Sequence, residues 1–347
     1  MASPVRVIVV GAGSRGEIYS NYASIHPKRM KVVAVADPRK FACTKLQKQH
    51  NIEDKNIFKD WQSIAEREKF ADAVLICTPD RLHKDPAVAF AKMGYHILLE
   101  KPMATTAEDC VAIVEACTQN GVMLSVGHVL RYDPLIHKIK ELIDAGVVGE
   151  VIHIQHLEPV GFYHFAHSFV RGNWRNEAES SFSLLAKSCH DIDLIHHWAG
   201  ARRAAESQIY RDVFSNQVVN MEFEGGLTAA FSMVAFTEEI CKRKTTIYGS
   251  MGELSCNGHE ITVFDFLTQR STKHTASSDA STHFGLSGHG GADYHLINAF
   301  ISAVANNNPS MIRSGPEETL ASHLLVFEAE RSRLESRVVN CGDDAQS

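Results

Sequence analysis

Near its beginning the chain reads Val5-Arg6-Val7-Ile8-Val9-Val10-Gly11-Ala12-Gly13-Ser14-Arg15-Gly16. The first six residues are mostly β-branched and apolar, which is typical of a buried strand. Three glycines follow with the spacing G-x-G-x-x-G, and the residues from Glu17 to about Ser24 are typical of a helix. At such a turn the first glycine permits the tight bend, the second lets a pyrophosphate approach the backbone, and the third lets the helix pack closely. The stretch therefore predicts a dinucleotide-binding loop formed by Gly11, Gly13, Ser14, Arg15 and Gly16.

A second strand, 31–36, ends in Asp37, which lies 21 positions after Gly16 (37 minus 16). An acid at about this distance binds the adenosine ribose hydroxyls of a dinucleotide. Because a carboxylate repels a 2′-phosphate, Asp37 predicts NAD in preference to NADP. Two alternatives stay open. Asp37 can serve as a turn former before Pro38, and Arg39 and Lys40 either soften the preference for NAD or are solvated charges at the start of a helix.

Strand and helix patterns continue to alternate after Asp37. Such repeated β-α-β units predict a parallel, doubly wound sheet. Further strands are expected at 71–77, 96–100 and 122–126, and helices at 41–50, 61–68, 82–93 and 106–120.

One of these strands ends in an acid, a lysine and a proline, in the heptapeptide His96-Ile97-Leu98-Leu99-Glu100-Lys101-Pro102. Proline cannot continue a central strand, and a buried ammonium must be paired or lose its proton. Ligands of open parallel sheets bind outside the carboxyl ends of the strands. Lys101 is therefore predicted to lie at the edge of a ligand crevice, and a lysine that only reaches solvent is the alternative.

From Glu206 onward the pattern changes to short strands separated by turn residues such as Gly225-Gly226 and Asn257-Gly258, as in an antiparallel meander. Helices at 184–198, 293–305 and 317–336 are expected to cover one face of this sheet. The other face is left for a partner, which predicts a homodimer or homotetramer. A helix is expected at 135–145, and strands at 151–157, 207–210, 218–223, 227–236, 244–249, 253–256 and 260–266.

Residues 161–175 are rich in aromatic residues, histidine and arginine, and their pattern is too irregular for a helix or strand. Flat rings and many hydrogen-bond donors suit a sugar. Because His164 and His167 form no closed ligand set with nearby cysteine or glutamate, no metal site is predicted. His289-Gly290-Gly291 precedes the helix at 293–305 and either lines the pocket or only leads into the helix.

The composition is that of an ordinary globular chain, with 347 residues, 44% hydrophobic, 22% charged and a net charge of −6. This length suits two domains. The charge predicts no nucleic-acid partner, and the strand-sized apolar runs predict no membrane span. Eight cysteines without a CxxC pair, and an N-terminus without a signal-peptide pattern, predict reduced thiols and a cytoplasmic location.

In this layout the chain resembles the Gfo/Idh/MocA family of oxidoreductases. The specific part is Glu100-Lys101-Pro102, about 20 residues after Thr78-Pro79-Asp80 with His83, because the glycine motif occurs in many dehydrogenases. The resemblance implies a Rossmann domain, expected over 1–127, and an α/β domain with an open-faced, mostly antiparallel sheet, expected over 128–347. Later segments that match are Arg131-Tyr132-Asp133-Pro134, Gly146-x-x-Gly149, Trp174-Arg175 and His190-Asp191-Ile192-Asp193.

The resemblance further implies hydride transfer between NAD and a carbinol of a sugar, cyclitol or related polyol, with NADP less favoured. A base must take the hydroxyl proton, and the resemblance assigns this role to Lys101, with His190 as the second catalytic residue. A buried core histidine is the alternative for His190. The implied cofactor contacts beyond the glycine loop are Asp37, Thr78, Pro79, His83, Glu100, Lys101, Trp174 and Arg175. The expected substrate contacts are Lys101 and His190, together with Tyr163 and His167 of the aromatic segment and Lys187 near His190.

The chain departs from the family pattern at one point. Many members have D-x-x-x-H here, whereas Ala186 stands four residues before His190 and Lys187 is the nearby polar residue. A substrate with a different hydroxyl pattern or charge is therefore expected. Two other functions stay open: a glycosidase that oxidises and re-reduces its substrate with bound NAD, and a dinucleotide-sensing protein with a dead site, which the retention of Lys101 and His190 disfavours.

Overall fold

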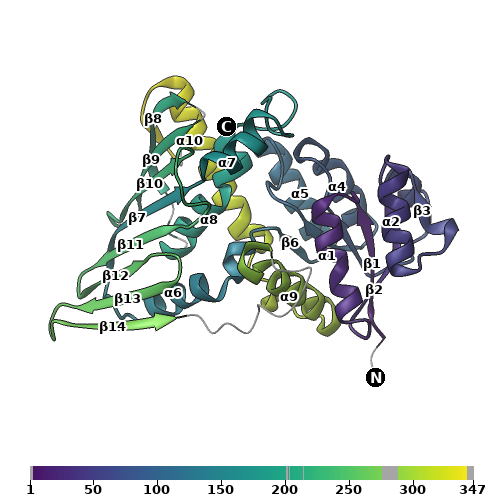
Figure 1. Cartoon of the computed structure of the whole chain (residues 1–347), viewed down its shortest axis with the longest axis horizontal. Helices are drawn as coiled ribbons and strands as arrows, with labels where there is room; N and C mark the ends of the chain where they lie inside the picture. The colour runs from purple at the N-terminus through teal and green to yellow at the C-terminus, as the bar shows by residue number, and fades with distance from the viewer. Residues whose placement is uncertain (1–2, 201, 203, 214, 276–287, 342–347) are drawn as a thin grey trace. The chain divides into compact units, whose positions relative to one another are not determined.

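The computed structural model describes residues 3–200, 202, 204–213, 215–275 and 288–341. The chain forms two compact units, and Figure 1 labels most of their elements. The first unit holds Met1–Asp133 and Ser278–Leu320, and the second holds Pro134–Ser277 and Ala321–Ser347. The boundaries expected from the sequence assigned every residue after 127 to the second domain, whereas the first unit extends to Asp133 and also includes Ser278–Leu320.

The first unit is built on a six-stranded sheet in the order β3-β2-β1-β4-β5-β6. All neighbouring strands run parallel, which confirms the predicted doubly wound sheet. Helices cover both faces, so the central strand β4 is apolar along its whole length and every one of its residues is buried. The strands are β1 (Val5–Val10), β2 (Met30–Ala36), β3 (Ile57–Phe58), β4 (Ala73–Ile76), β5 (His96–Leu99) and β6 (Leu124–Val126), and the helices are α1 (Ser14–Ile25), α2 (Lys40–His50), α3 (Gln62–Ala65), α4 (Lys84–Lys92) and α5 (Ala107–Gln119).

Helix α9 (Ala292–Asn306) also belongs to the first unit, where it packs against α1. Arg29, just after α1, donates hydrogen bonds to Asn298 and Ser302 of α9, both at 2.6 Å. The Tyr22 hydroxyl donates to Asn298 at 2.8 Å. The prediction that 293–305 covers the sheet of the second domain is therefore wrong, because α9 is used to cover the Rossmann unit.

The second unit contains a nine-stranded sheet in the order β14-β13-β12-β11-β7-β10-β9-β8-β15. All neighbouring pairs are antiparallel except β7 and β10, which run parallel. The predicted open, mostly antiparallel sheet is thus confirmed. Its strands are β7 (Val151–Pro159), β8 (Ala204–Val213), β9 (Asn216–Phe223), β10 (Thr228–Val234), β11 (Lys244–Gly249), β12 (Gly252–Cys256), β13 (Glu260–Asp265), β14 (Arg270–Thr275) and β15 (Val339–Asn340).

The two faces of this sheet differ in burial. Along β9 the residues Val219, Met221 and Phe223 are buried and alternate with more exposed ones, as the period of a strand requires. Helices α6 (Pro134–Asp144) and α8 (Cys189–Trp198) pack against the sheet, and α10 (Pro316–Glu335) is the remaining long helix. On the opposite face, side chains such as Tyr248 and Phe264 stay exposed.

Residues 161–175 contain two short helical turns, so the prediction of an entirely irregular segment is wrong. Helix α7 spans Phe162–Phe165, and a π turn spans Ala166–Val170. The rings of Phe165 and Phe169, four residues apart, stack with their centroids at 5.4 Å. Such an aromatic pair stabilises a short helical turn, although the mixed composition of this segment shows no helical pattern. Within the described residues, no helix is both long and apolar enough to cross a membrane.

Candidate active site

The glycine loop joins β1 to α1, and its three glycines are required for different reasons. Gly11 has a φ of +91°, and a Cβ there would lie 2.5 Å from the Cys77 carbonyl oxygen. A Cβ at Gly16 would lie 2.1 Å from the Gly11 carbonyl oxygen. A Cβ at Gly13, in contrast, would have only the Arg39 Nη2 atom within 4 Å, at 3.5 Å. The space beside Gly13 is thus open at the start of α1, as a bound pyrophosphate requires, so these residues fit a dinucleotide.

Asp37 follows β2 and is 5% exposed. Its Oδ2 accepts hydrogen bonds from the backbone N–H of Ala12 and from Arg39 Nη2, both at 2.8 Å. Its Oδ1 accepts from the backbone N–H of Arg39 at 2.8 Å and from Arg39 Nε at 2.9 Å. Burial raises the pKa of Asp37, but the hydrogen bonds from Arg39 and Ala12 outweigh it and hold the pKa below its ordinary value. Asp37 is therefore a carboxylate against the glycine loop, with Arg39 as its partner.

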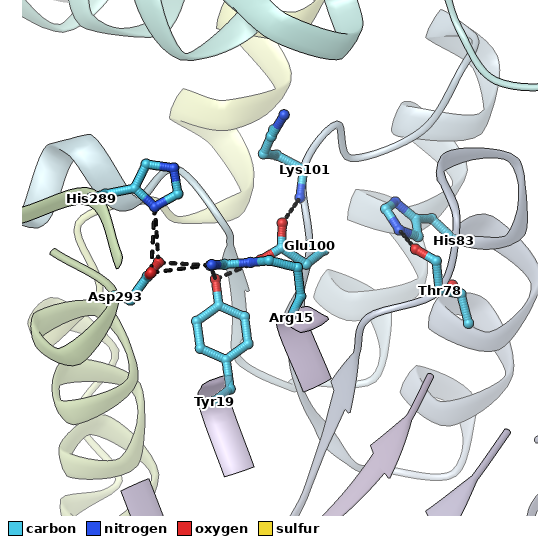
Figure 2. Close-up of polar contacts among 8 residues, drawn as sticks. All are labelled: Arg15, Tyr19, Thr78, His83, Glu100, Lys101, His289 and Asp293. Carbon is cyan, nitrogen blue, oxygen red and sulfur yellow. Dashed lines mark hydrogen bonds and ion pairs between the residues drawn. The ribbon is translucent and has the colours of Figure 1, made fainter. Parts of the chain in front are cut away.

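His83 connects the loop after β4 to the loop after β5. Its side chain is fully buried. Nδ1 lies 2.7 Å from the Pro102 carbonyl oxygen and Nε2 lies 2.8 Å from the Thr78 carbonyl oxygen. The Thr78 hydroxyl donates to the Leu82 carbonyl at 2.9 Å, and Pro79 precedes the turn of this loop. His83 thus holds the two loops, which contain most of the remaining predicted cofactor contacts, at the carboxyl edge of the sheet. Figure 2 shows its contact with Thr78.

Four side chains form a connected network beside β5, which we call the Arg15 network: Arg15, Tyr19, Glu100 and Asp293 (Figure 2). Arg15 donates from Nε to Glu100 Oε1 at 2.7 Å, and from Nη2 and Nη1 to the two oxygens of Asp293 at 2.7 and 3.1 Å. The Tyr19 hydroxyl donates to Glu100 Oε1 at 2.6 Å. Glu100 Oε2 accepts from the backbone N–H of Lys101 at 3.1 Å. The network fixes the backbone at Lys101, while the Lys101 side chain points away from it.

Both carboxyl groups of the Arg15 network are ionised at neutral pH. Burial raises the pKa of Glu100, but Arg15 and the Tyr19 hydrogen bond lower it by more. Burial also raises the pKa of Asp293, and hydrogen bonds from His289 and Arg15 more than offset this, so its pKa lies well below the ordinary value. The guanidinium of Arg15 therefore serves two protein carboxylates, and the cofactor contact expected of Arg15 stays a prediction.

Lys187 belongs to a buried ionic cluster of the second unit, which we call the Asp191 cluster: His156, Glu158, Lys187, Asp191, Cys241 and Arg243. Lys187 Nζ lies 3.0 Å from Glu158 Oε1 and donates to Cys241 Sγ at 3.1 Å. Arg243 Nε lies 2.6 Å from Asp191 Oδ1 and 3.2 Å from Glu158 Oε2, and His156 Nε2 lies 3.0 Å from Asp191 Oδ1. Burial raises the pKa of Asp191, yet Arg243 and His156 hold it far below its ordinary value.

The other predicted residues of the second unit lie on α8 and around α7. His190 is 5% exposed and lies in the first turn of α8. The preceding residues, Leu184–Ser188, form a π turn, and such wide turns are frequent at functional sites. Tyr163 lies in α7 and His167 in the π turn that follows it, and both are exposed. The Trp174 ring lies 6.0 Å from that of Phe169, and Arg175 Nη2 lies 3.6 Å from Glu179 Oε2.

Sequence reasoning missed the Arg15 network because its members come from distant segments. Arg15 and Asp293 are 278 positions apart. Two local signals were available. Tyr19 lies four residues after Arg15, hence on the same face of α1, and Asp293 lies in the first turn of a helix that follows Gly288-His289-Gly290-Gly291.

Comparison with known proteins identifies relatives over part of the chain. Over 272 residues the chain is 27% identical to a scyllo-inositol 2-dehydrogenase (NAD(+)) of Bacillus subtilis (strain 168), which covers 76% of this chain and 74% of that protein. Over 199 residues it is 29% identical to a 2,7-anhydro-N-acetylneuraminate hydratase of Escherichia coli (strain K12), which covers 55% of this chain. This second match spans about half of the relative's own length, at 49%.

Solved structures share the fold. An inositol dehydrogenase homolog from Azotobacter vinelandii, complexed with NADH and myo-inositol, matches with a TM-score of 0.81 at 19% identity, covering 98% of both chains. A levoglucosan dehydrogenase, complexed with NADH and L-sorbose, matches with a TM-score of 0.84 at 18% identity, covering 98% of this chain and 99% of that one.

Two family models match most of the chain. The model described as "Oxidoreductase family, NAD-binding Rossmann fold" matches residues 5–128. The model described as "Oxidoreductase family, C-terminal alpha/beta domain" matches residues 140–340. The chain therefore belongs to the Gfo/Idh/MocA family of NAD(P)-dependent oxidoreductases.

Proposed function

We propose that the protein is an NAD-dependent dehydrogenase that oxidises a carbinol of a sugar, cyclitol or related polyol, with Lys101 as the proton-transfer residue. The observation that carries the proposal is the position of Lys101. It follows β5 at the carboxyl edge of the Rossmann sheet, and its backbone is fixed by Glu100 of the Arg15 network. This is the edge at which open parallel sheets bind their ligands.

The substrate class is supported by the relatives. Relatives and fold neighbours are named as inositol and levoglucosan dehydrogenases, and some of their structures contain NADH with myo-inositol or L-sorbose. All of these ligands are polyhydroxylated rings or chains. The hydratases among the relatives are named for a modified acidic sugar. The proposed substrate class therefore includes sugars and their derivatives, and no single substrate is selected.

The cofactor would be held by the glycine loop and by Asp37. The open space beside Gly13 accommodates the pyrophosphate, and the Asp37 carboxylate accepts hydrogen bonds from the ribose hydroxyls. Because Asp37 is ionised, we infer that NAD binds more tightly than NADP. When bound, the nicotinamide supplies the site at which a hydride is accepted or donated.

Lys101 Nζ then takes the proton from the substrate hydroxyl during oxidation and returns it to the carbonyl oxygen during reduction. Glu100 and Arg15 act by positioning, since they hold the backbone from which the lysine projects. His190 is proposed to hold the reacting hydroxyl by a hydrogen bond. Its location in the first turn of α8, directly after a π turn, supports this role.

The test is turnover of a panel of inositols, aldoses, anhydrosugars and sugar acids with NAD⁺ as oxidant. One NADH is expected per molecule of oxidised product, measured by NADH absorbance together with product analysis. Product formation without net NADH would contradict a dehydrogenase and favour a mechanism that regenerates its NAD within each cycle. Binding of NADH without turnover of any panel member would favour a sensing protein.

A further inference from the structure

His289 precedes α9 in an unusual backbone conformation. Its φ is +50°, in the left-handed region, and Gly290 and Gly291 follow with φ values of +66° and +96°. For a residue with a side chain this conformation costs on the order of 1–2 kcal/mol, and such residues cluster at functional sites. The glycines let the chain bend sharply here, so that the ring of His289 folds back over the first turn of α9.

The ring of His289 is held by Asp293. Nδ1 lies 3.3 and 3.4 Å from the two carboxylate oxygens of Asp293, which is fully buried, whereas the His289 side chain is 42% exposed. Arg15 binds the same carboxylate through both of its Nη atoms and fixes its orientation. A carboxylate can only accept hydrogen bonds, so Asp293 selects the tautomer with the proton on Nδ1. Nε2 is then the unprotonated nitrogen of the neutral ring.

A continuous series of contacts connects this histidine to the proposed catalytic lysine. His289 contacts Asp293, Asp293 binds Arg15, Arg15 binds Glu100, and Glu100 accepts from the backbone N–H of Lys101. Figure 2 shows the His289 ring over Asp293 and the Lys101 side chain over Glu100, on the same side of this series. The Arg15 network thus connects the His289 ring to the backbone of the proposed catalytic lysine.

We propose that His289 is a second proton-transfer residue of this site, which Asp293 orients so that Nε2 exchanges a proton with an oxygen of the substrate. The inference rests on the proposed function, because it places the substrate beside Lys101. During an exchange the proton moves between Nε2 and the substrate oxygen, while the Nδ1 proton stays on the hydrogen bond to Asp293. This is the arrangement by which a buried aspartate orients a catalytic histidine in hydrolases.

The first experiment is a tautomer measurement that needs no substrate. In protein labelled with ¹⁵N-histidine, the His289 signals are assigned by comparison with His289→Asn, because asparagine tolerates the left-handed conformation. We expect the Nδ1–H tautomer in the wild type and its loss in Asp293→Asn. A neutral ring with the proton on Nε2, or a tautomer unaffected by Asp293→Asn, would overturn the proposal whether or not the protein turns over any sugar.

The second experiment measures kcat against pH for the panel member that is turned over. His289→Asn should lower kcat by about 10²-fold and remove one limb of the pH profile, and added imidazole should restore part of the rate. Asp293→Asn should lower kcat less and shift that limb. Among the described residues, the titratable groups joined to His289 through the Arg15 network are Asp293, Arg15, Tyr19 and Glu100, and the Asp133 carboxylate lies near Gly290.

The matched control is His26→Gln. His26 lies between the same two helices and contacts the Tyr294 hydroxyl of α9 at 3.0 Å, but at the opposite end of α1. We expect kcat and its pH profile to be unchanged in this variant. If His289→Asn keeps both turnover and the pH profile while the wild type forms NADH, the inference fails and the proposed function stands. If the wild type oxidises nothing, the proposed function fails, and the tautomer measurement still decides the role of Asp293.

Discussion

Replacing Arg39 by alanine should widen the preference for NAD over NADP. A carboxylate offers about four acceptor positions, and in Asp37 four donors occupy them: the Ala12 backbone N–H and the backbone N–H, Nε and Nη2 of Arg39. Two of the four come from the Arg39 guanidinium. Ribose hydroxyls that bind Asp37 must therefore displace this guanidinium, and in the variant they need not.

The expected change in NAD affinity follows from the solvent exposure of the Asp37–Arg39 ion pair. The Arg39 side chain is 51% exposed and that of Asp37 is 3% exposed. A half-exposed ion pair contributes about 0.2–1 kcal/mol, so NAD should bind at most about fivefold more tightly to Arg39→Ala. NADP should bind more weakly, because its 2′-phosphate loses a charged hydrogen bond of about 1.5–3 kcal/mol, equivalent to roughly 10- to 150-fold.

Dissociation constants of NADH and NADPH, measured by titration of wild type, Arg39→Ala and the neighbouring control Lys40→Ala, test this reasoning. The ratio of the two constants should change by at least about tenfold in Arg39→Ala and little in Lys40→Ala. If Arg39→Ala weakens NADH more than NADPH, Arg39 supports NAD binding directly and the competition for Asp37 is refuted.

Three further predictions concern other parts of the molecule. Arg15→Lys should lower the free energy of unfolding by about 2–4 kcal/mol, because an ammonium lacks the planar fork that binds Glu100 and Asp293; a loss of NADH affinity without a loss of stability in a denaturant titration would contradict this. Asp191→Asn should lower the free energy of unfolding by about 3–5 kcal/mol. Because the folded-state pKa of Asp191 is lowered, its contribution to stability is complete above the unfolded value of ~3.9. The difference in urea unfolding between wild type and variant should therefore be constant from about pH 5 to 8, and it should shrink only in strong acid, as the pH falls toward the lowered folded-state pKa. Tyr248→Glu, on the exposed face of the second sheet, should convert a homodimer or homotetramer into smaller species by light scattering, and a monomeric wild type at micromolar concentration would refute an interface on that face.

Much of the fold could be predicted because its signals are local. Strands β1, β2 and β5 are apolar runs bounded by glycine, aspartate or proline, and the glycine loop has a spacing with one structural meaning. The edge strands β14 and β15 could not be predicted. Residues of β14 are almost all exposed, so no alternation of buried and exposed side chains marks it, and β15 has only two residues.

Only those residues of the candidate site could be predicted whose position depends on a local sequence pattern. Asp37 and Lys101 follow strands of a parallel sheet, so strand order alone brings them to one edge. The pairing of Arg15 with Asp293, and the place of α9 in the first unit, depend on contacts between opposite ends of the chain. A regular helix was expected over 184–198, but the π turn at Leu184–Ser188 changes the helical period before His190, and Lys187 pairs with Glu158.

The central claim is that Lys101 transfers the proton during hydride transfer, and its most direct test is kcat and the dissociation constant of NADH for Lys101→Ala and Lys101→Arg. A general acid–base residue contributes about 10²–10⁴-fold, so kcat should fall by at least roughly 10²-fold in Lys101→Ala, with NADH affinity within a few-fold of wild type. Lys101→Arg should fail nearly as completely, because a guanidinium cannot release its proton in a protein. Intact turnover combined with weakened NADH binding in Lys101→Ala would contradict the claim and would show that the lysine only positions the cofactor.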